Sequence, residues 1–227
     1  MRPRQRLSGR WIKRRALAVL LGLVAASAAC TDPRPPAGPL EVLPARLSED
    51  GARLIPLSDG DSVELVRPIQ GGHVLFIGAL LRYPADGDGT LRGELRRVDA
   101  SGQAGPVIVY DERTTAHQAL AADTPAPPAP NAADASGWRQ IPPDLTSVAN
   151  IPVCPDFFDY DLVDAALILR ISFKDRAGRE AAADRRVKTR CAQTDPVQQG
   201  LCRCECQAKY TIDRCFSRPD AGSGDGG

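Results

Sequence analysis

Short apolar runs with a period of two constrain the fold of this 227-residue chain more than any other feature. Alternation of apolar and polar residues is typical of a β-strand with one face in a core. In the clearest run, at residues 167–173, every second side chain is large and apolar. About seven such runs, bounded by Gly, Pro and Asp, cover residues 62–66, 74–81, 90–98, 106–111, 147–153, 167–173 and 180–190. They predict an all-β fold, an antiparallel β-sandwich, over residues 40–190.

Turn-forming residues predict how some of these strands connect. Residues 175–178 end in Gly178 and predict the tight turn of a hairpin. Residues 86–89 alternate Asp and Gly and predict a second hairpin loop. The run at 74–81 is apolar throughout, which predicts a central strand covered on both faces, and Gly71 and Gly72 before it predict a bulge or bend.

Two features bear on the details of the sandwich. Immunoglobulin-like topology is the commonest arrangement of such a strand count, but its hallmark Trp is missing between Cys154 and Cys191. Residues 114–143 are rich in Pro and Ala and interrupt the strands, which predicts a long loop in which 118–122 is compatible with a helical turn.

The first 29 residues have the composition of a secretory signal peptide. Seven basic and no acidic residues precede an apolar run at 16–29 that ends in small side chains. This run is shorter than the roughly 20 apolar residues that a membrane-spanning helix needs. We therefore predict that the chain is exported.

The end of that run, Ser27-Ala28-Ala29-Cys30, resembles the lipobox of bacterial lipoproteins, in which the Cys is diacylated and becomes the new N-terminus. The family usually has Leu where this chain has Ser27. The chain has seven cysteines, and lipid on Cys30 leaves six, enough for three disulfides. We predict a membrane anchor at Cys30 and a Pro-rich stalk over residues 30–39. The alternative is cleavage after Ala28, which would release a soluble secreted protein.

Residues 191–216 are predicted to form a short cysteine-rich module, followed by a disordered Ser/Gly/Asp tail at 217–227. Disulfides are predicted among Cys154, Cys191, Cys202, Cys204, Cys206 and Cys215. The preferred pairing joins Cys154 to Cys191 and places two bonds among the other four cysteines. A Cys-centred metal or redox protein is the alternative; C-x-C intervals are tighter than the usual spacing of zinc ligands, and export favours oxidation.

Charge and motifs narrow the function further. Without the signal peptide the chain has 22 basic and 28 acidic residues, a net charge near −6, so no nucleic-acid partner is expected. Neither histidine lies near a G-x-S-x-G or H-E-x-x-H motif. We therefore predict a non-enzymatic protein without a cofactor, in which His73 caps a backbone group at a strand end and His117 is solvated.

A hydrolase is the alternative function, because carboxylates lie close together at Asp156, Asp159, Asp161 and Asp164. Such density is compatible with an acid/base pair or with Ca²⁺. The spacing does not follow the calcium-loop pattern, which requires Gly and then a distal Glu. Solvated turn carboxylates are the preferred interpretation.

Exposed side chains suggest where a partner binds. Phe157, Phe158 and Tyr160 follow Pro155 and are predicted to form a contact patch. Basic residues are predicted to lie on exposed strand faces, where they discourage aggregation, at Arg92, Arg96, Arg97, Arg185, Arg186, Lys188 and Arg190. The prediction is binding of an envelope protein or a glycan.

Several stretches together resemble an uncharacterised lipoprotein family common in myxobacteria. They are the signal and stalk, the sequence GGHVLFIG at 71–78, the sequence NIPVCP at 150–155 and the cysteine-rich end. The resemblance spans most of the mature chain and implies a β-rich domain tethered in the cell envelope, with no known activity. Thr31, rather than Asp, after Cys30 implies sorting to the outer membrane.

Overall fold

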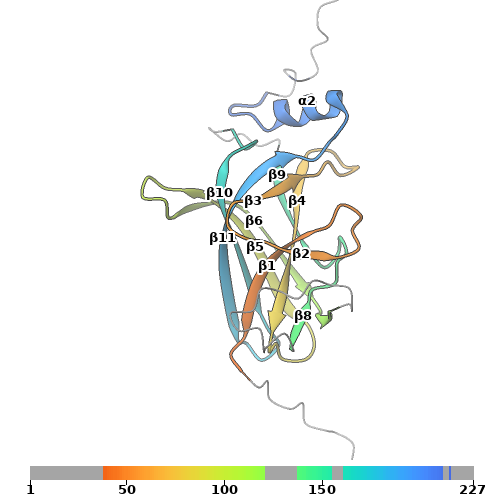
Figure 1. Cartoon of the computed structure of the whole chain (residues 1–227), viewed down its shortest axis with the longest axis vertical. Coiled ribbons are helices and arrows are strands. Elements are labelled where there is room, and N and C mark those ends of the chain that lie inside the picture. The colour runs from red at the N-terminus through yellow and green to blue at the C-terminus, as the bar shows by residue number, and fades with distance from the viewer. Residues whose placement is uncertain (1–37, 121–136, 155–160, 212–214, 216–227) are drawn as a thin grey trace, which may run out of the picture. The chain divides into compact units, whose positions relative to one another are not determined.

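A computed structural model describes residues 38–120, 137–154, 161–211 and 215. In this part of the chain the secondary structure is almost entirely strand, arranged as two sheets, with one short helix near the C-terminus (Figure 1). The all-β prediction is confirmed. Cys30, the signal and stalk residues 31–37 lie outside the described residues.

The first sheet, sheet A, is organised around β4 (His73–Arg82). One edge of β4 pairs with β1 (Glu41–Leu47), which in turn pairs with β2 (Leu54–Pro56). Its other edge pairs with β9 (Ala149–Cys154) near the start of β4 and with β8 (Trp138–Gln140) near its end. β7 (Gln118–Ala119) adds to β8. All these pairs are antiparallel.

The prediction of a central strand with a bend before it is confirmed at β4. Most of its side chains are buried, because both neighbours and both faces are covered. Gly71 and Gly72 have φ values of +89° and +72°, a region that side-chain-bearing residues rarely adopt. The pairing with β9 then shifts register between His73 and Val74, as in a β-bulge.

The second sheet, sheet B, has the order β3 (Asp61–Leu65), β11 (Glu180–Cys191), β10 (Ala166–Lys174), β5 (Gly89–Val98) and β6 (Ala104–Thr115). The predicted hairpin between β10 and β11 is confirmed, with Gly178 at φ +80° in its turn. The edge strand β3 runs parallel to β11, so the expectation of a wholly antiparallel fold is wrong at this pair.

Two local predictions are wrong. Residues 86–89 do not close a hairpin, because β4 belongs to sheet A and β5 to sheet B, so this loop crosses between sheets. Residues 118–119 form β7 rather than a helical turn. Both predictions relied on the turn-forming or helix-forming tendency of neighbouring residues. The pairing of strands depends instead on residues far away in the sequence.

One core lies between the sheets. Leu75, Ile77 and Leu81 of β4 are buried against the inward side chains of sheet B, among them Leu91, Leu95, Leu169 and Ile171. Along one side a carboxylate ties the sheets together. The side chain of Asp111 in β6 accepts hydrogen bonds from the backbone N of Asn150 in β9 at 2.8 Å and from Arg113 Nε at 2.7 Å.

The helix α2 (Pro196–Glu205) lies within the predicted cysteine-rich module, where the sequence interpretation expected no helix. Asp195 is its N-cap and accepts from the backbone N of Gln198 at 2.9 Å, and Pro196 follows at the first helical position. Both are standard signals for a helix start. The sequence interpretation considered only the cysteines of this module and not these signals. No helix among the described residues is long and apolar enough to cross a membrane.

Candidate functional site

A cleft of about 320 Å³ opens between the two sheets, and we call it the acidic cleft. It lies where the turn between β1 and β2 approaches β3, the early part of β4 and the loop before β9. Its lining residues are Arg46, Leu47, Ser48, Glu49, Asp50, Gly51, Val63, Glu64, Val66, Phe76, Ile77, Asp144 and Leu145. The volume is at the lower end of the range for ligand pockets, so it suits a side chain or a small molecule.

The floor of the acidic cleft is apolar. Val63 and Ile77 belong to the core and are fully buried, and the half-buried Phe76, the residue before Ile77 in β4, also lines the cleft. Leu145 stands at the mouth with 54% of its surface exposed. An exposed Leu above an apolar floor provides a surface that a hydrophobic group of a ligand can contact.

The rim carries four carboxylates, Glu49, Asp50, Glu64 and Asp144, and one cation, Arg46. Glu64 is paired with Arg190 of β11, so the unpaired negative charge comes from the other three. A hydrogen bond from the Ser48 hydroxyl lowers the pKa of Asp50, and one from the Thr146 hydroxyl lowers the pKa of Asp144. Backbone N–H groups of the same turns donate to both carboxylates. Asp50 and Asp144 are therefore fully ionised at neutral pH, and the rim favours a cationic ligand.

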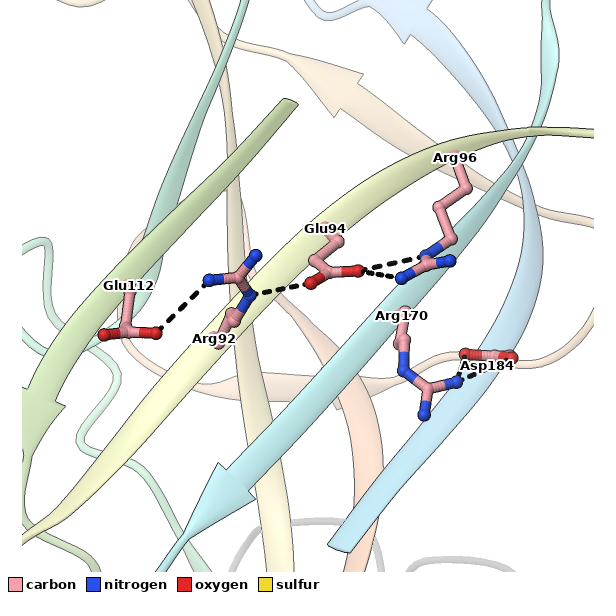
Figure 2. Close-up of polar contacts among 6 residues, drawn as sticks. All are labelled: Arg92, Glu94, Arg96, Glu112, Arg170 and Asp184. Atoms are coloured by element: carbon pink, nitrogen blue, oxygen red, sulfur yellow. Dashed lines mark hydrogen bonds and ion pairs between the residues drawn. The ribbon is translucent and has the colours of Figure 1, made fainter. Parts of the chain in front are cut away.

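The outer face of sheet B has a different character (Figure 2). Glu94 accepts hydrogen bonds from Arg92 Nε at 2.7 Å and from Arg96 Nη2 at 2.6 Å. Burial raises the pKa of Glu94, but these two guanidinium groups outweigh burial and hold the pKa below its usual range. Arg92 also reaches Glu112, and Arg170 on β10 pairs with Asp184 on β11 at 3.1 Å.

These ion pairs add to the expectation of exposed basic strands. Glu94 lies between Arg92 and Arg96 in the sequence, and in the structure its carboxylate pairs with both guanidinium groups. Arg92 also lies over the ring of Tyr110, 4.0 Å from its centre. Because these arginines are paired with carboxylates, the positive potential of this face is weaker than the number of arginines suggests. A polyanion would therefore bind this face more weakly.

Three disulfides hold the C-terminal module. They join Cys154 to Cys206, Cys191 to Cys202, and Cys204 to Cys215. The set of six cysteines matches the prediction, but the preferred pairing of Cys154 with Cys191 is wrong. Of the two bonds expected among the other four cysteines, only Cys204–Cys215 is present. α2 brings Cys206 to the end of β9 and Cys202 to the end of β11, so each strand is bonded to the helix rather than to the other strand.

A buried ionisable cluster lies under the helix. His73 Nδ1 is 3.1 Å from Glu205 Oε2, and Arg67 Nη2 is 3.5 Å from the other oxygen of Glu205. Burial, with a smaller contribution from the Arg67 charge, lowers the pKa of His73 to about 4, and burial raises the pKa of Glu205. His73 is therefore neutral at pH 7 and faces a carboxylate. The expectation that it caps a backbone group is wrong.

This cluster predicts a loss of stability in acid. The unfolded chain protonates His73 near pH 6.5 and the folded chain only near pH 4, so the folded state becomes less stable as pH falls between these values. We expect His73 to reduce the free energy of unfolding by about 2 kcal/mol between about pH 7 and pH 5. Denaturant unfolding at both pH values, in the native chain and in His73→Gln, measures the difference.

Glu205 acts in the opposite sense, because its raised pKa lets the folded chain keep a proton that the unfolded chain releases. The His73→Gln variant retains Glu205, so the change in pH dependence between the two proteins isolates His73. Equal pH dependence in the native chain and the variant would contradict the assignment.

His117 is buried rather than solvated, which corrects the sequence interpretation. Its Nε2 donates to the Ala85 carbonyl at 2.8 Å, and its ring meets the edge of Phe173. Burial lowers the pKa of His117 despite that hydrogen bond. Since Ala85 lies in the crossover between the sheets, His117 has a structural role in holding this crossover.

The carboxylate cluster of the hydrolase alternative is only partly described. Asp156 and Asp159 lie outside the described residues, as do the predicted contact residues Phe157, Phe158 and Tyr160. Asp161 accepts from the backbone N of Ala208 at 2.8 Å, and Asp164 pairs with Arg203 of α2 at 3.2 Å. These two carboxylates hold the helical module, so no described contact favours a catalytic role for them.

Comparison of the chain with protein-family models, curated proteins and solved structures finds no match. The functional proposal therefore rests on the geometry of the described residues. The sequence interpretation missed the acidic cleft, because its residues come from four separate segments with no shared motif. It also missed Glu205, although the position of this residue directly before Cys206 marks it as a neighbour of the disulfides.

Proposed function

We propose that the chain is a non-enzymatic lipoprotein of the bacterial cell envelope, anchored through Cys30, whose two-sheet domain is a β-sandwich that binds a protein ligand. The anchor is expected in the outer membrane, with a soluble secreted form as the alternative. The observation that carries the binding role is the acidic cleft, with its apolar floor and its four carboxylates.

The cleft chemistry favours a particular kind of ligand. An apolar side chain seated near Leu145 and Phe76 would be removed from water, which is worth roughly 1.5–3 kcal/mol for a side chain the size of Leu. Lys or Arg residues on either side of it would meet the acidic rim. We therefore propose that the ligand is an extended segment with a large apolar residue flanked by basic residues.

The sheet edge beside the cleft suits an extended ligand. β3 is an edge strand of sheet B, and its residues Val63 and Glu64 line the cleft. Directly after β3, Val66 pairs with Val74 of β4, so the edge available to a ligand ends before Val66. An extended segment gains affinity by pairing with an open strand edge while alternate side chains enter neighbouring pockets. Binding along β3 would direct one side chain of the segment toward the floor.

Synthetic peptides test this proposal. We expect peptides with a central Leu flanked by Lys to bind the full mature chain, and the same peptides flanked by Glu to bind at least about tenfold more weakly. Leu145→Ser is expected to weaken binding about tenfold while changing the free energy of unfolding by less than about 0.5 kcal/mol. Fluorescence polarisation and denaturant unfolding provide the two readouts.

Val197→Ser is the matched control, because Val197 is an exposed apolar residue of α2 that does not line the cleft. It is expected to bind the basic peptides as the native chain does. Equal binding of acidic and basic peptides would overturn the proposal, as would equal losses in the two variants. Binding of a glycan panel that is insensitive to Leu145→Ser would identify the other ligand class expected from the sequence.

The anchor is tested separately. We expect the protein from native membranes to carry a diacyl or triacyl group on Cys30, and Cys30→Ser to move it from the membrane fraction to the soluble fraction. Intact mass after treatment with a thiol alkylator measures the acyl group and free thiols together. A soluble native protein with one alkylated thiol would establish the secreted alternative instead.

A further inference from the structure

Three buried side chains with metal-binding atoms converge under α2. A ring nitrogen of His73 and the sulfurs of Cys202 and Cys206 all lie within 4.8 Å of one another. Cys202 and Cys206 are four residues apart and face the same side of the helix, and His73 comes from the start of β4. All three residues are at most 2% exposed.

Their chemistry and spacing fit a zinc site once the sulfurs are thiolates. Zinc binds Cys sulfur at about 2.3 Å and His nitrogen at about 2.0–2.1 Å, which places ligand atoms about 3.5–3.8 Å apart in a tetrahedron. The ligand atoms lie within 4.8 Å of one another in the oxidised chain, so they need to approach by at most about 1 Å to reach that value. The C-x-C intervals that argued against zinc involve Cys204, whereas the converging pair is Cys202 and Cys206, spaced within the usual range of two to four residues.

The surroundings of His73 match those of a metal-bound histidine. Its Nδ1 faces the Glu205 carboxylate at 3.1 Å, and metal-bound histidines usually direct their other ring nitrogen to such a carboxylate. Among the described residues, neither ring nitrogen of His73 has a hydrogen-bond partner, and neither does the facing Glu205 Oε2. Nε2 is therefore available to a metal ion. Cys154 is the cross-strand partner of His73, so its thiol would lie beside the same site.

We propose that the reduced chain binds one Zn²⁺ through His73, Cys202 and Cys206, with Cys154 as the fourth ligand, and that oxidation to the disulfides releases the ion. Zinc binding displaces the three thiol protons. Two equivalents of a small disulfide oxidant then accept four electrons from the three cysteine ligands and Cys191. The products are the Cys154–Cys206 and Cys191–Cys202 disulfides, four small thiols and free Zn²⁺, with three protons taken back from solvent.

The proposal is tested on the full mature chain, reduced with a phosphine in the absence of oxygen. Zn²⁺ is titrated in competition with a chromogenic chelator, and Co²⁺ provides the thiolate-to-metal charge-transfer band as a spectroscopic signature. We expect one ion per chain in the reduced protein, none in the oxidised protein, and release of zinc on adding oxidised glutathione.

Variants separate a built site from general thiol chelation. Cys202→Ser and His73→Gln are expected to weaken zinc binding by about tenfold or more, whereas Cys204→Ser, in the same helix but outside the cluster, retains the native affinity. Loss of affinity in Cys204→Ser equal to that in Cys202→Ser would overturn the proposal, because it indicates chelation by an unstructured thiol-rich segment. Zinc binding that does not depend on His73 would also overturn it, as would the absence of zinc binding to the reduced chain.

Discussion

Replacing both Cys154 and Cys206 with Ala is expected to lower the free energy of unfolding by about 4 kcal/mol. The bond closes a segment with a sequence separation of 52 residues, and the stabilisation that a cross-link gives through the unfolded state increases with the length of the loop. It also fixes the end of β9 to the end of α2. Chemical denaturation under oxidising conditions, with the other two disulfides intact, measures the loss.

The Cys204–Cys215 bond provides the control, because its sequence separation is only 11 residues. Replacing that pair with Ala is expected to cost about 3 kcal/mol at most. If the short-range pair proves the more costly of the two, loop closure does not govern the stability of this module. The stabilising role assigned to the Cys154–Cys206 link would then be wrong.

Phe173→Ala is expected to lower the free energy of unfolding by about 3–5 kcal/mol. Phe173 is the largest fully buried side chain among the described residues and lies in β10, where it pairs with Leu91 of β5. Its ring fills the space that a Cβ on Gly89 would occupy and meets the ring of His117. Truncation leaves a cavity at the crossover end of the core, which the surrounding sheets are unable to fill.

Ile69→Ala is the control for this truncation, since Ile69 is fully exposed in the turn before β4. It is expected to change the free energy of unfolding by less than about 0.5 kcal/mol. Denaturant midpoints with unchanged slopes would show that both variants unfold from the same native state. A loss of under about 1 kcal/mol in Phe173→Ala would mean that the core near Gly89 is loosely packed.

The strand positions were predictable because the signal is local. Alternating side chains identified β10, and the apolar run with two preceding glycines identified β4 and the bend before it. The short strands β2, β7 and β8 were missed, because two or three residues carry no periodicity and are held in place by their neighbours in sheet A. The seven-residue strand β1 was missed as well, since Pro44 interrupts its sequence and it is identified only by its pairing with β4.

The functional residues were less accessible to sequence reasoning. In the sequence, His73 is an isolated histidine at the start of a strand. Only the packing of α2 places Glu205 and Cys206 next to it. The acidic cleft likewise depends on bringing Asp50, Glu64 and Asp144 from three separate segments to one rim. Neither arrangement has a spacing that a motif would capture.

The sequence by itself determined the all-β class, the long strands other than β1, the turn at Gly178 and the set of cysteines available for disulfides, because each depends on neighbouring residues or on composition. Only the tertiary structure decided which strands share a sheet, which cysteines pair and which charges meet. Those outcomes depend on contacts between residues far apart in the chain, such as Cys154 with Cys206 and β3 with β11. Local propensity does not encode them, since the same strand pattern is compatible with many pairings.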